Sequence, residues 1–295
     1  MKSHSKQKGI SYSKYGWMFI SVPVLFFLVF TLYPAIESLK MSFQTFSDGV
    51  YYFSGFNNII KMFGDKLFLK ALLNTFLFMI IQIPIMMVLA LFLATLLNSK
   101  ALRLRSFFRT SIFIPCVTSL VAYSLLFKML FANQGLINHV LVQTGMMKNA
   151  VQWLDNPFWA SVVIIIALTW RWTGYNVIFY ISAMQNIPEE TYEAAQIDGA
   201  NAFKTFWHIT VPQLKPIILL TMIMSTNGTL QLFDEPMNIT GGGPANTTMT
   251  ISQYIYNQSF VYSPNFPYAA TLSYVIVIIM VILAIIQFKF VGGDE

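Results

Sequence analysis

The sequence is poor in charge. Asp, Glu, Lys and Arg make up 10% of its 295 residues and hydrophobic residues make up 56%, with a mean hydropathy of +0.61. A soluble domain usually carries about 25% charged residues to cover the surface that faces water. The shortage therefore excludes a soluble enzyme, a disordered chain and a small secreted domain, and it predicts an integral membrane protein.

Cysteine and metal-ligand patterns are scarce as well. Cys116 is the single cysteine, so no disulfide can form within the chain. The three histidines, His4, His139 and His208, are scattered, and neither an HExxH nor a CxxC motif occurs. We expect no metal site, no catalytic residues and no cofactor bound by this chain.

Long apolar runs are abundant. Because ~20 mostly apolar residues are needed to cross a bilayer as a helix, these runs predict an all-α fold, a polytopic membrane helix bundle with about six transmembrane helices. The run at 213–235 is the least apolar, and a re-entrant segment is the alternative for it. The expected spans are about 16–36, 71–97, 107–131, 158–182, 213–235 and 267–290.

The basic residues predict the orientation of these spans. If residues 1–15 form a cytoplasmic N-terminal segment and the C-terminus is also cytoplasmic, eleven Lys and Arg residues lie inside and five outside. Four lysines between the first two spans, Lys40, Lys61, Lys66 and Lys70, oppose this trend. The net charge of +6 is thus interpreted as topology, with no nucleic-acid partner.

The connection at 186–212 has its own pattern. Pro188 can start a helix whose first turn carries Glu189 and Glu190, and Gly199 permits a sharp end. Residues 202–209 follow as a second short helix with several apolar side chains. This segment is either a hairpin resting on its own bundle or a docking element for a cytoplasmic partner.

A family resemblance follows from the same segment. Glu193-Ala194-Ala195, Gly199, Ile209 and Pro212 stand at the spacing EAA-x3-G-x9-I-x-L-P, with Val211 in place of Leu. This resembles the signature of importer-type ABC transporter permeases. Segments such as Thr240-Gly-Gly-Gly-Pro244 resemble the maltose-transporter type of carbohydrate permease, and the likeness extends over most of the chain, about 14–290. We call residues 186–212 the EAA loop.

The resemblance implies a transmembrane permease subunit of an ATP-driven sugar importer, with an oligosaccharide as the expected cargo and a bacterial cell membrane as its location. Expected partners are a second permease subunit, two ATPase subunits that hold ATP and Mg, and an extracellular or periplasmic sugar-binding protein. Transport would proceed by alternating access. The residues expected on a coupling helix that enters the ATPase are Glu193, Ala194, Ala195, Asp198 and Gly199.

A candidate substrate path centres on the fourth expected span. Arg171 is a charge at membrane depth, flanked by Trp170 and Trp172, and Tyr175 and Asn176 follow about one turn later. Aromatic rings can contact the C–H faces of a sugar, while Arg and Asn can bond its hydroxyls. The alternative is an aromatic belt in which Arg171 reaches the lipid headgroups.

The resemblance adds residues to this path. In such permeases the same stretch and the end of the fifth span line the sugar site, and Trp170, Trp172, Thr229, Leu232 and Asp234 match by spacing. Arg171 and Asp234 depart from the usual pattern, which suggests a polar or larger glycan. They could also pair with each other in a structural role.

Two other functions are alternatives. An importer permease for a non-sugar solute would keep the EAA loop but should lack the glycine-rich segment at 240–244. A membrane-embedded enzyme acting on glycans should show clustered acidic or metal-binding residues. Asp234-Glu235 is an acidic pair, but adjacent residues point in different directions on a helix and no metal partner accompanies them.

Overall fold

The computed structural model describes residues 13–99 and 102–291. Most of the expected N-terminal segment, including Lys2, Lys6 and Lys8, lies outside the described residues, as does Lys100. Within this range the expected all-helical class is confirmed, with one small hairpin added. Four helices are long and apolar enough to cross a membrane, or up to six if each of two bent pairs counts as one span.

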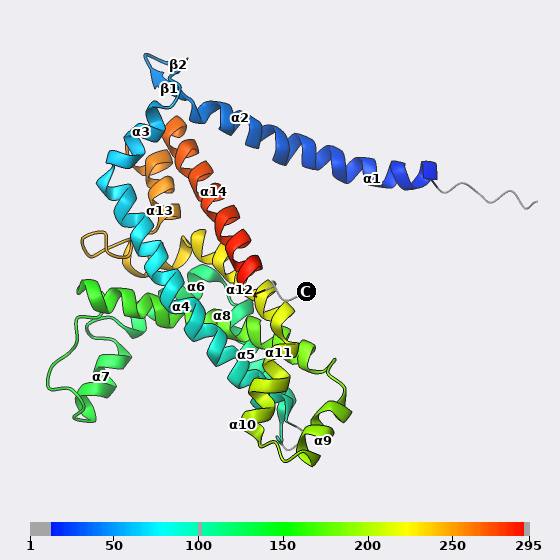
Figure 1. The fold of residues 1–295 in the computed structure, drawn as a ribbon. Coiled ribbons are helices and arrows are strands. Elements are labelled where there is room, and N and C mark those ends of the chain that lie inside the picture. The colour runs from blue at the N-terminus through cyan, green and yellow to red at the C-terminus, as the bar shows by residue number, and fades with distance from the viewer. Residues whose placement is uncertain (1–12, 100–101, 292–295) are drawn as a thin grey trace, which may run out of the picture.

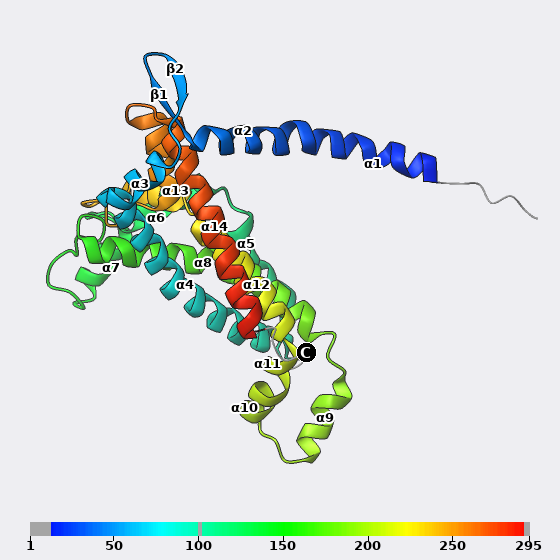
Figure 2. The same ribbon diagram turned by 45° about the horizontal axis from the view of Figure 1, so that its top comes forward.

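The first helical stretch projects from the bundle as an arm (Figures 1 and 2). It consists of α1 (Ser13–Phe27), a π-helical turn (Leu28–Leu32) and α2 (Tyr33–Ser42). None of its most apolar window is buried against the rest of the chain. The end of α2 is attached to α14 (Phe266–Val291), where the Thr271 hydroxyl donates to the carbonyl oxygen of Ser42 at 2.8 Å and Tyr274 donates to that of Ala35. A helix this apolar requires lipid or another chain around it.

A short hairpin and an amphipathic helix follow the arm. β1 (Gln44–Ser47) pairs antiparallel with β2 (Val50–Phe53), with Gln44 opposite Phe53. α3 (Asn57–Gly64) buries Asn58, whose amide donates to the carbonyl oxygens of Ser42 at 3.0 Å and Gln44 at 2.8 Å. These bonds fix the hairpin and α3 to the end of α2.

The centre of the bundle is the crossing of α4 (Lys66–Asn98) and α8 (Pro157–Met184). Ala90 and Ala94 are fully buried against Val177 and Tyr180, because small side chains on one helix let the other approach closely. Near this crossing α5 (Arg105–Val117) also reaches α8. A Cβ on Gly174 would lie 1.9 Å from the carbonyl oxygen of Ile112, so only glycine fits there.

The third expected span is broken. α5 ends at Val117 and α6 (Leu120–Leu130) starts after two extended residues, Thr118 and Ser119, at an angle of 98°. Pro115 lies in the last turn of α5, where it cannot donate a backbone hydrogen bond. One span was expected over about 107–131, and the structure forms it from two helices joined at this break.

The fifth expected span also differs from a straight helix over 213–235. α12 (Lys215–Leu230) is 16 residues long, about 24 Å at 1.5 Å per residue, and the chain leaves the helix at Gln231. The helical segment before it, Ala202–Gln213, meets α12 at an angle of 69°. The remaining elements are α7 (Leu136–Gln143), α9 (Glu189–Ile197), α10 (Ala202–Thr205), α11 (Val211–Gln213), α13 (Ile251–Tyr256) and π-helical turns at Phe206–Thr210, Pro236–Thr240 and Asn257–Val261.

Three of the four lysines that oppose the orientation trend have partners within the molecule. Lys40 pairs with Glu37 at 2.7 Å, Lys61 lies over the Tyr268 ring at 4.4 Å, and Lys70 donates to the carbonyl oxygen of Ala245 at 2.6 Å. These lysines stabilise local structure, which gives them a role unrelated to membrane orientation.

Asp65, at the start of α4, accepts hydrogen bonds from three helices at one end of the bundle. Its Oδ1 accepts the backbone N–H groups of Leu67 at 3.0 Å and Phe68 at 3.1 Å, which makes it the N-cap. Its Oδ2 accepts the hydroxyls of Tyr254 at 2.5 Å and Tyr268 at 2.7 Å. Burial raises the pKa of Asp65, but these four hydrogen bonds outweigh it and hold the pKa below its usual range.

We predict that Asp65→Asn lowers the stability of the purified protein by about 1–3 kcal/mol at pH 7, because the tyrosine hydroxyls lose a charged acceptor. Asn still caps a helix, so the change isolates the charge. Thermal unfolding followed by tryptophan fluorescence measures it. Because the folded pKa is lowered, the extra stability is present above the pKa of the unfolded carboxyl and is lost as the pH falls through the folded value.

The difference between wild type and Asp65→Asn should therefore shrink below about pH 4. Asp155→Asn is the matched control, since Asp155 is exposed and accepts a single hydrogen bond, from Asn133 at 2.9 Å. It should change stability by less than about 0.5 kcal/mol. An Asp65→Asn difference that is equal at pH 7 and pH 3 would contradict the role of the charge.

Candidate functional site

The two broken spans border a partly open cavity of about 270 Å³. α6 turns away after Ser119 and α12 ends at Leu230, so neither fills the space beside α8. Non-helical backbone at membrane depth is tolerated where it lines a cavity, and residues 231–233 do so here. The lining residues are Gln82, Met86, Leu120, Leu168, Trp172, Tyr175, Asn176, Met224, Ser225, Gly228, Thr229, Gln231, Leu232, Phe233, Asp234 and Glu235.

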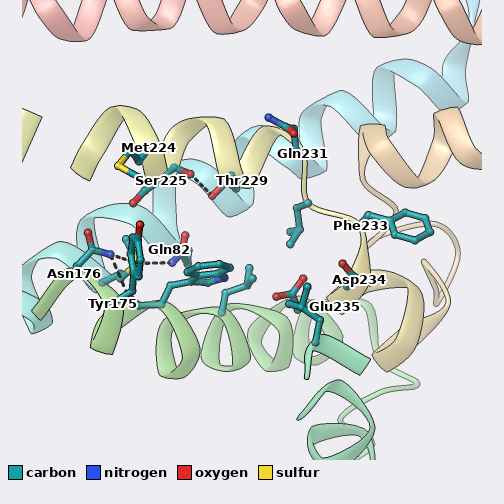
Figure 3. Close-up of a pocket in the computed structure, with 16 residues that line it drawn as sticks. Gln82, Tyr175, Asn176, Met224, Ser225, Thr229, Gln231, Phe233, Asp234 and Glu235 are labelled. Atoms are coloured by element: carbon teal, nitrogen blue, oxygen red, sulfur yellow. Dashed lines mark hydrogen bonds between the residues drawn. The ribbon is translucent and has the colours of Figure 1, made fainter. Parts of the chain in front are cut away.

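One end of the cavity carries amide side chains and aromatic rings, as Figure 3 shows for Gln82, Tyr175 and Asn176. The amide nitrogen of Asn176 donates to the carbonyl oxygen of Trp172 at 3.0 Å and lies 3.5 Å from the sulfur of Met86. Asn176 is only 2% exposed, and within the described part of the chain its Oδ1 has no hydrogen-bond partner. A buried acceptor without a donor is costly, so this atom is suited to a ligand O–H or N–H.

The opposite end carries two carboxyl groups, those of Asp234 and Glu235 (Figure 3). Glu235 is buried and accepts the hydroxyl of Tyr123. Asp234 is half-buried, and its backbone carbonyl accepts the amide of Asn238 at 2.7 Å. The cavity thus combines aromatic and apolar walls with hydrogen-bonding groups at both ends, which is typical of a small-molecule site.

The EAA loop forms a second, exposed feature at the far end of α8 (Figure 1). α9 begins directly after Pro188 and ends at Ile197, and Gly199 two residues later has a φ of +76°, the left-handed conformation that favours glycine. Asn201 then caps α10 by accepting the N–H of Lys204 at 2.9 Å. The helix start, the sharp end and the second short helix expected in this segment are all present.

This loop presents apolar side chains to solvent. Ala195 is buried and Tyr192 bonds the Thr210 hydroxyl at 3.2 Å, which holds the two arms of the hairpin together. By contrast Ile197 is 86% exposed and Phe203 is 71% exposed. Exposed apolar side chains of this size can contact another protein.

The chain matches the family model described as binding-protein-dependent transport system inner membrane component over residues 60–290. It belongs to this family. The family resemblance drawn from the EAA loop is therefore confirmed, and the chain is a membrane permease component.

Individual relatives support the assignment. The chain is 50% identical over 251 residues to the lactose transport system permease protein of Rhizobium radiobacter, with 84% of each chain covered. It is 35% identical over 268 residues to the arabinooligosaccharides transport system permease protein of Bacillus subtilis, covering 87% of this chain and 83% of the relative.

A solved structure shares the fold. A chain of a bacterial ABC transporter involved in the import of the acidic polysaccharide alginate superposes with a TM-score of 0.83 at 21% identity. The match covers 96% of this permease and 97% of that chain. At this identity the likeness concerns the fold.

The cavity brings together six of the eight residues expected on the substrate path. Residues separated by more than fifty positions in sequence meet there because α8 and the end of α12 border the same space. The six that line it are Trp172, Tyr175, Asn176, Thr229, Leu232 and Asp234.

Trp170 and Arg171 do not line this cavity. The Trp170 ring packs against those of Phe127 at 5.5 Å and Tyr123 at 6.2 Å between centroids, on the other side of α8. Sequence reasoning did not single out Gln82, which lines the cavity from α4. Its signal was a lone amide within a long apolar run, where a polar side chain indicates function.

Arg171 holds the break between α5 and α6. Its Nη1 donates to the carbonyl oxygens of Pro115 at 3.1 Å and Thr118 at 2.9 Å, and its Nη2 donates to that of Cys116 at 3.2 Å. It is 5% exposed, so it neither reaches lipid headgroups nor pairs with Asp234. The last carbonyls of a helix lack internal partners, and Arg171 supplies donors for them inside the bundle.

We predict that Arg171→Met lowers the stability of the permease by about 2–5 kcal/mol, because three buried or partly buried carbonyls lose their donor. Its membrane abundance should fall as well. Arg171→Lys should be intermediate, since an ammonium group cannot reproduce the fork of the guanidinium. Immunoblots of membranes and thermal unfolding in detergent measure both effects.

Arg103→Met is the matched control, because Arg103 is exposed in the connection before α5. It should leave abundance and stability unchanged. If Arg171→Met were as stable as wild type but required a higher substrate concentration for uptake, Arg171 would belong to the substrate path instead.

Proposed function

We propose that this chain is one permease subunit of an ATP-driven importer of oligosaccharides. The observation that carries the proposal is the cavity inside a permease-family bundle, walled by Trp172 and Tyr175 and equipped with amide and carboxyl groups at its ends. Aromatic rings suit the C–H faces of sugars, and the polar ends suit their hydroxyls. Relatives named for lactose and arabinooligosaccharide transport favour the same cargo class.

The proposed pathway requires a second permease subunit. The most apolar part of the first helical arm packs against no other part of the described chain, and α6 and α12 of the two bent spans contribute only part of the cavity wall. A second permease beside this one would complete the path across the bilayer. Six spans, with both termini in the cytoplasm, place the EAA loop inside and the end of α4 that Asp65 caps outside.

The energy source lies in other chains. We propose that two ATPase subunits bind ATP and Mg and that this permease binds no cofactor. The EAA loop would dock into them through the exposed side chains of Ile197 and Phe203, with Glu193, Ala194, Ala195, Asp198 and Gly199 on the coupling surface. A binding protein outside would deliver the sugar, and alternating access would move it inward.

Deletion of the gene for this chain tests the cargo. We expect the deletion strain to lose uptake of radiolabelled oligosaccharide and to regain it with a plasmid copy. Lactose and an arabinooligosaccharide are the first cargoes to test. Normal sugar uptake in the deletion strain, together with loss of uptake of a peptide or an ion, would contradict the sugar assignment.

We predict that Gly199→Pro abolishes uptake while leaving the abundance of the permease normal. Proline fixes φ near −65°, whereas Gly199 has a φ of +76° and donates its N–H to the carbonyl oxygen of Gln196 at 3.0 Å. The substitution therefore distorts the turn between α9 and α10. Uptake and ATP hydrolysis by the purified complex measure the loss of coupling.

Gly145→Pro is the matched control. Gly145 follows α7 with a φ of +73° and donates to the carbonyl oxygen of Val142 at 3.1 Å, so the local strain is the same at a site far from the EAA loop. Uptake should persist in this variant. Preserved uptake in Gly199→Pro at normal abundance would remove the loop from the coupling mechanism.

A further inference from the structure

Within the described residues, the cavity lining contains carboxyl groups and no basic groups. Asp234 and Glu235 contribute carboxyl groups at the same end, and no Lys, Arg or His of the described chain lines the space. This matters because sugars differ in charge: many oligosaccharides are neutral, whereas uronates and aldonates carry carboxylates. The cavity wall can discriminate between these classes.

The nearby cation, Arg171, acts on Glu235 at a distance but forms its hydrogen bonds elsewhere. Arg171 directs its N–H groups at the carbonyls of the broken span, and the ring of Tyr123 lies 4.7 Å from its guanidinium carbon. Tyr123 in turn donates its hydroxyl to Glu235. The aromatic ring thus stands between the two charges, and no ion pair joins Arg171 to either carboxyl group in the described chain.

The other end of the cavity has no basic side chain from the described chain, and its polar groups are amides and hydroxyls. Asn176 keeps its amide nitrogen on the carbonyl oxygen of Trp172 and leaves its Oδ1 without a donor. An amide oxygen and two carboxyl groups all accept hydrogen bonds from sugar hydroxyls. A carboxylate on the sugar could supply no donor to any of them.

We propose that this cavity selects uncharged oligosaccharides and rejects those that carry a carboxylate, and that Asp234 is the residue that determines this selection. The inference rests on the proposed function and adds the substrate class to it. Asp234 is the deciding group because its side chain is half-buried at the cavity, whereas Glu235 is buried and already held by Tyr123. Like charges in a partly desolvated site should weaken binding about tenfold or more.

The test uses the purified transporter complex without its binding protein, so that the preference of the binding protein does not enter. Lactitol and lactobionate are the probes, because they have the same open-chain shape and differ in charge. Quenching of tryptophan fluorescence reports binding, since Trp172 lines the cavity. Wild type should bind lactitol at least about tenfold more tightly than lactobionate.

Asp234→Asn should reduce this preference to about threefold or less, mainly by improving the binding of lactobionate. Asp48→Asn is the matched control, since it removes an exposed carboxylate in the β1–β2 turn, far from the cavity (Figure 1). It should leave the preference unchanged. In wild type, raising the salt concentration should strengthen the binding of lactobionate and leave lactitol unaffected, a measurement that needs no variant.

Equal affinities for the two probes in wild type would overturn the inference, as would a preference that persists in Asp234→Asn. Absence of binding by both probes would also overturn it, because the cavity would then not hold sugar. Uptake by the deletion strain tests the proposed function separately. A strain that requires this permease for sugar uptake, combined with equal probe affinities, would reject the charge selection alone.

Discussion

Backbone groups inside a bilayer must find partners within the protein, because no water is present to bond them. In this permease that requirement is most acute where the third span breaks at Thr118 and Ser119. Arg171 meets it by donating to the carbonyl oxygens of three residues at the end of α5. These bonds lie at the 98° break between α5 and α6, and the cavity beside α8 borders the same break.

The same requirement explains how charge is distributed through the bundle. Arg171 acts within the protein, Asp65 caps α4 and joins two tyrosines, and Lys40 and Lys70 bond nearby groups. Asp234 differs, since its side chain lies at a cavity. In a chain with so few charges, the side chains that reach a cavity therefore decide which ligands fit it.

α8 connects the two functional regions. Its middle carries Trp172 and Asn176 at the cavity, and its end at Met184 leads within a few residues into the EAA loop. α8 packs closely against α4 and α5, including the contact at Gly174. A displacement of the loop can therefore reach the cavity wall as a rigid-body movement of one helix.

The sequence by itself determined that this protein lies in a membrane, that it is helical and to which family it belongs. Composition and apolar runs report on the bilayer directly, and the EAA spacing records a local turn at Gly199 whose geometry needs no distant partner. Six of the proposed path residues were also recognisable from local pattern and resemblance. Local pattern did not distinguish Trp170 and Arg171, which do not line the cavity, from neighbours that do. The position of a residue within a span does not say which side of the helix faces a cavity.

Tertiary structure decided what those residues contact. The 98° break lies where Arg171 from another helix bonds the carbonyl oxygens at the end of α5. Gln82, Asn176 and Glu235 share one cavity because α4, α8 and the segment after α12 converge there. Such convergence depends on packing between helices distant in sequence, which local pattern does not encode.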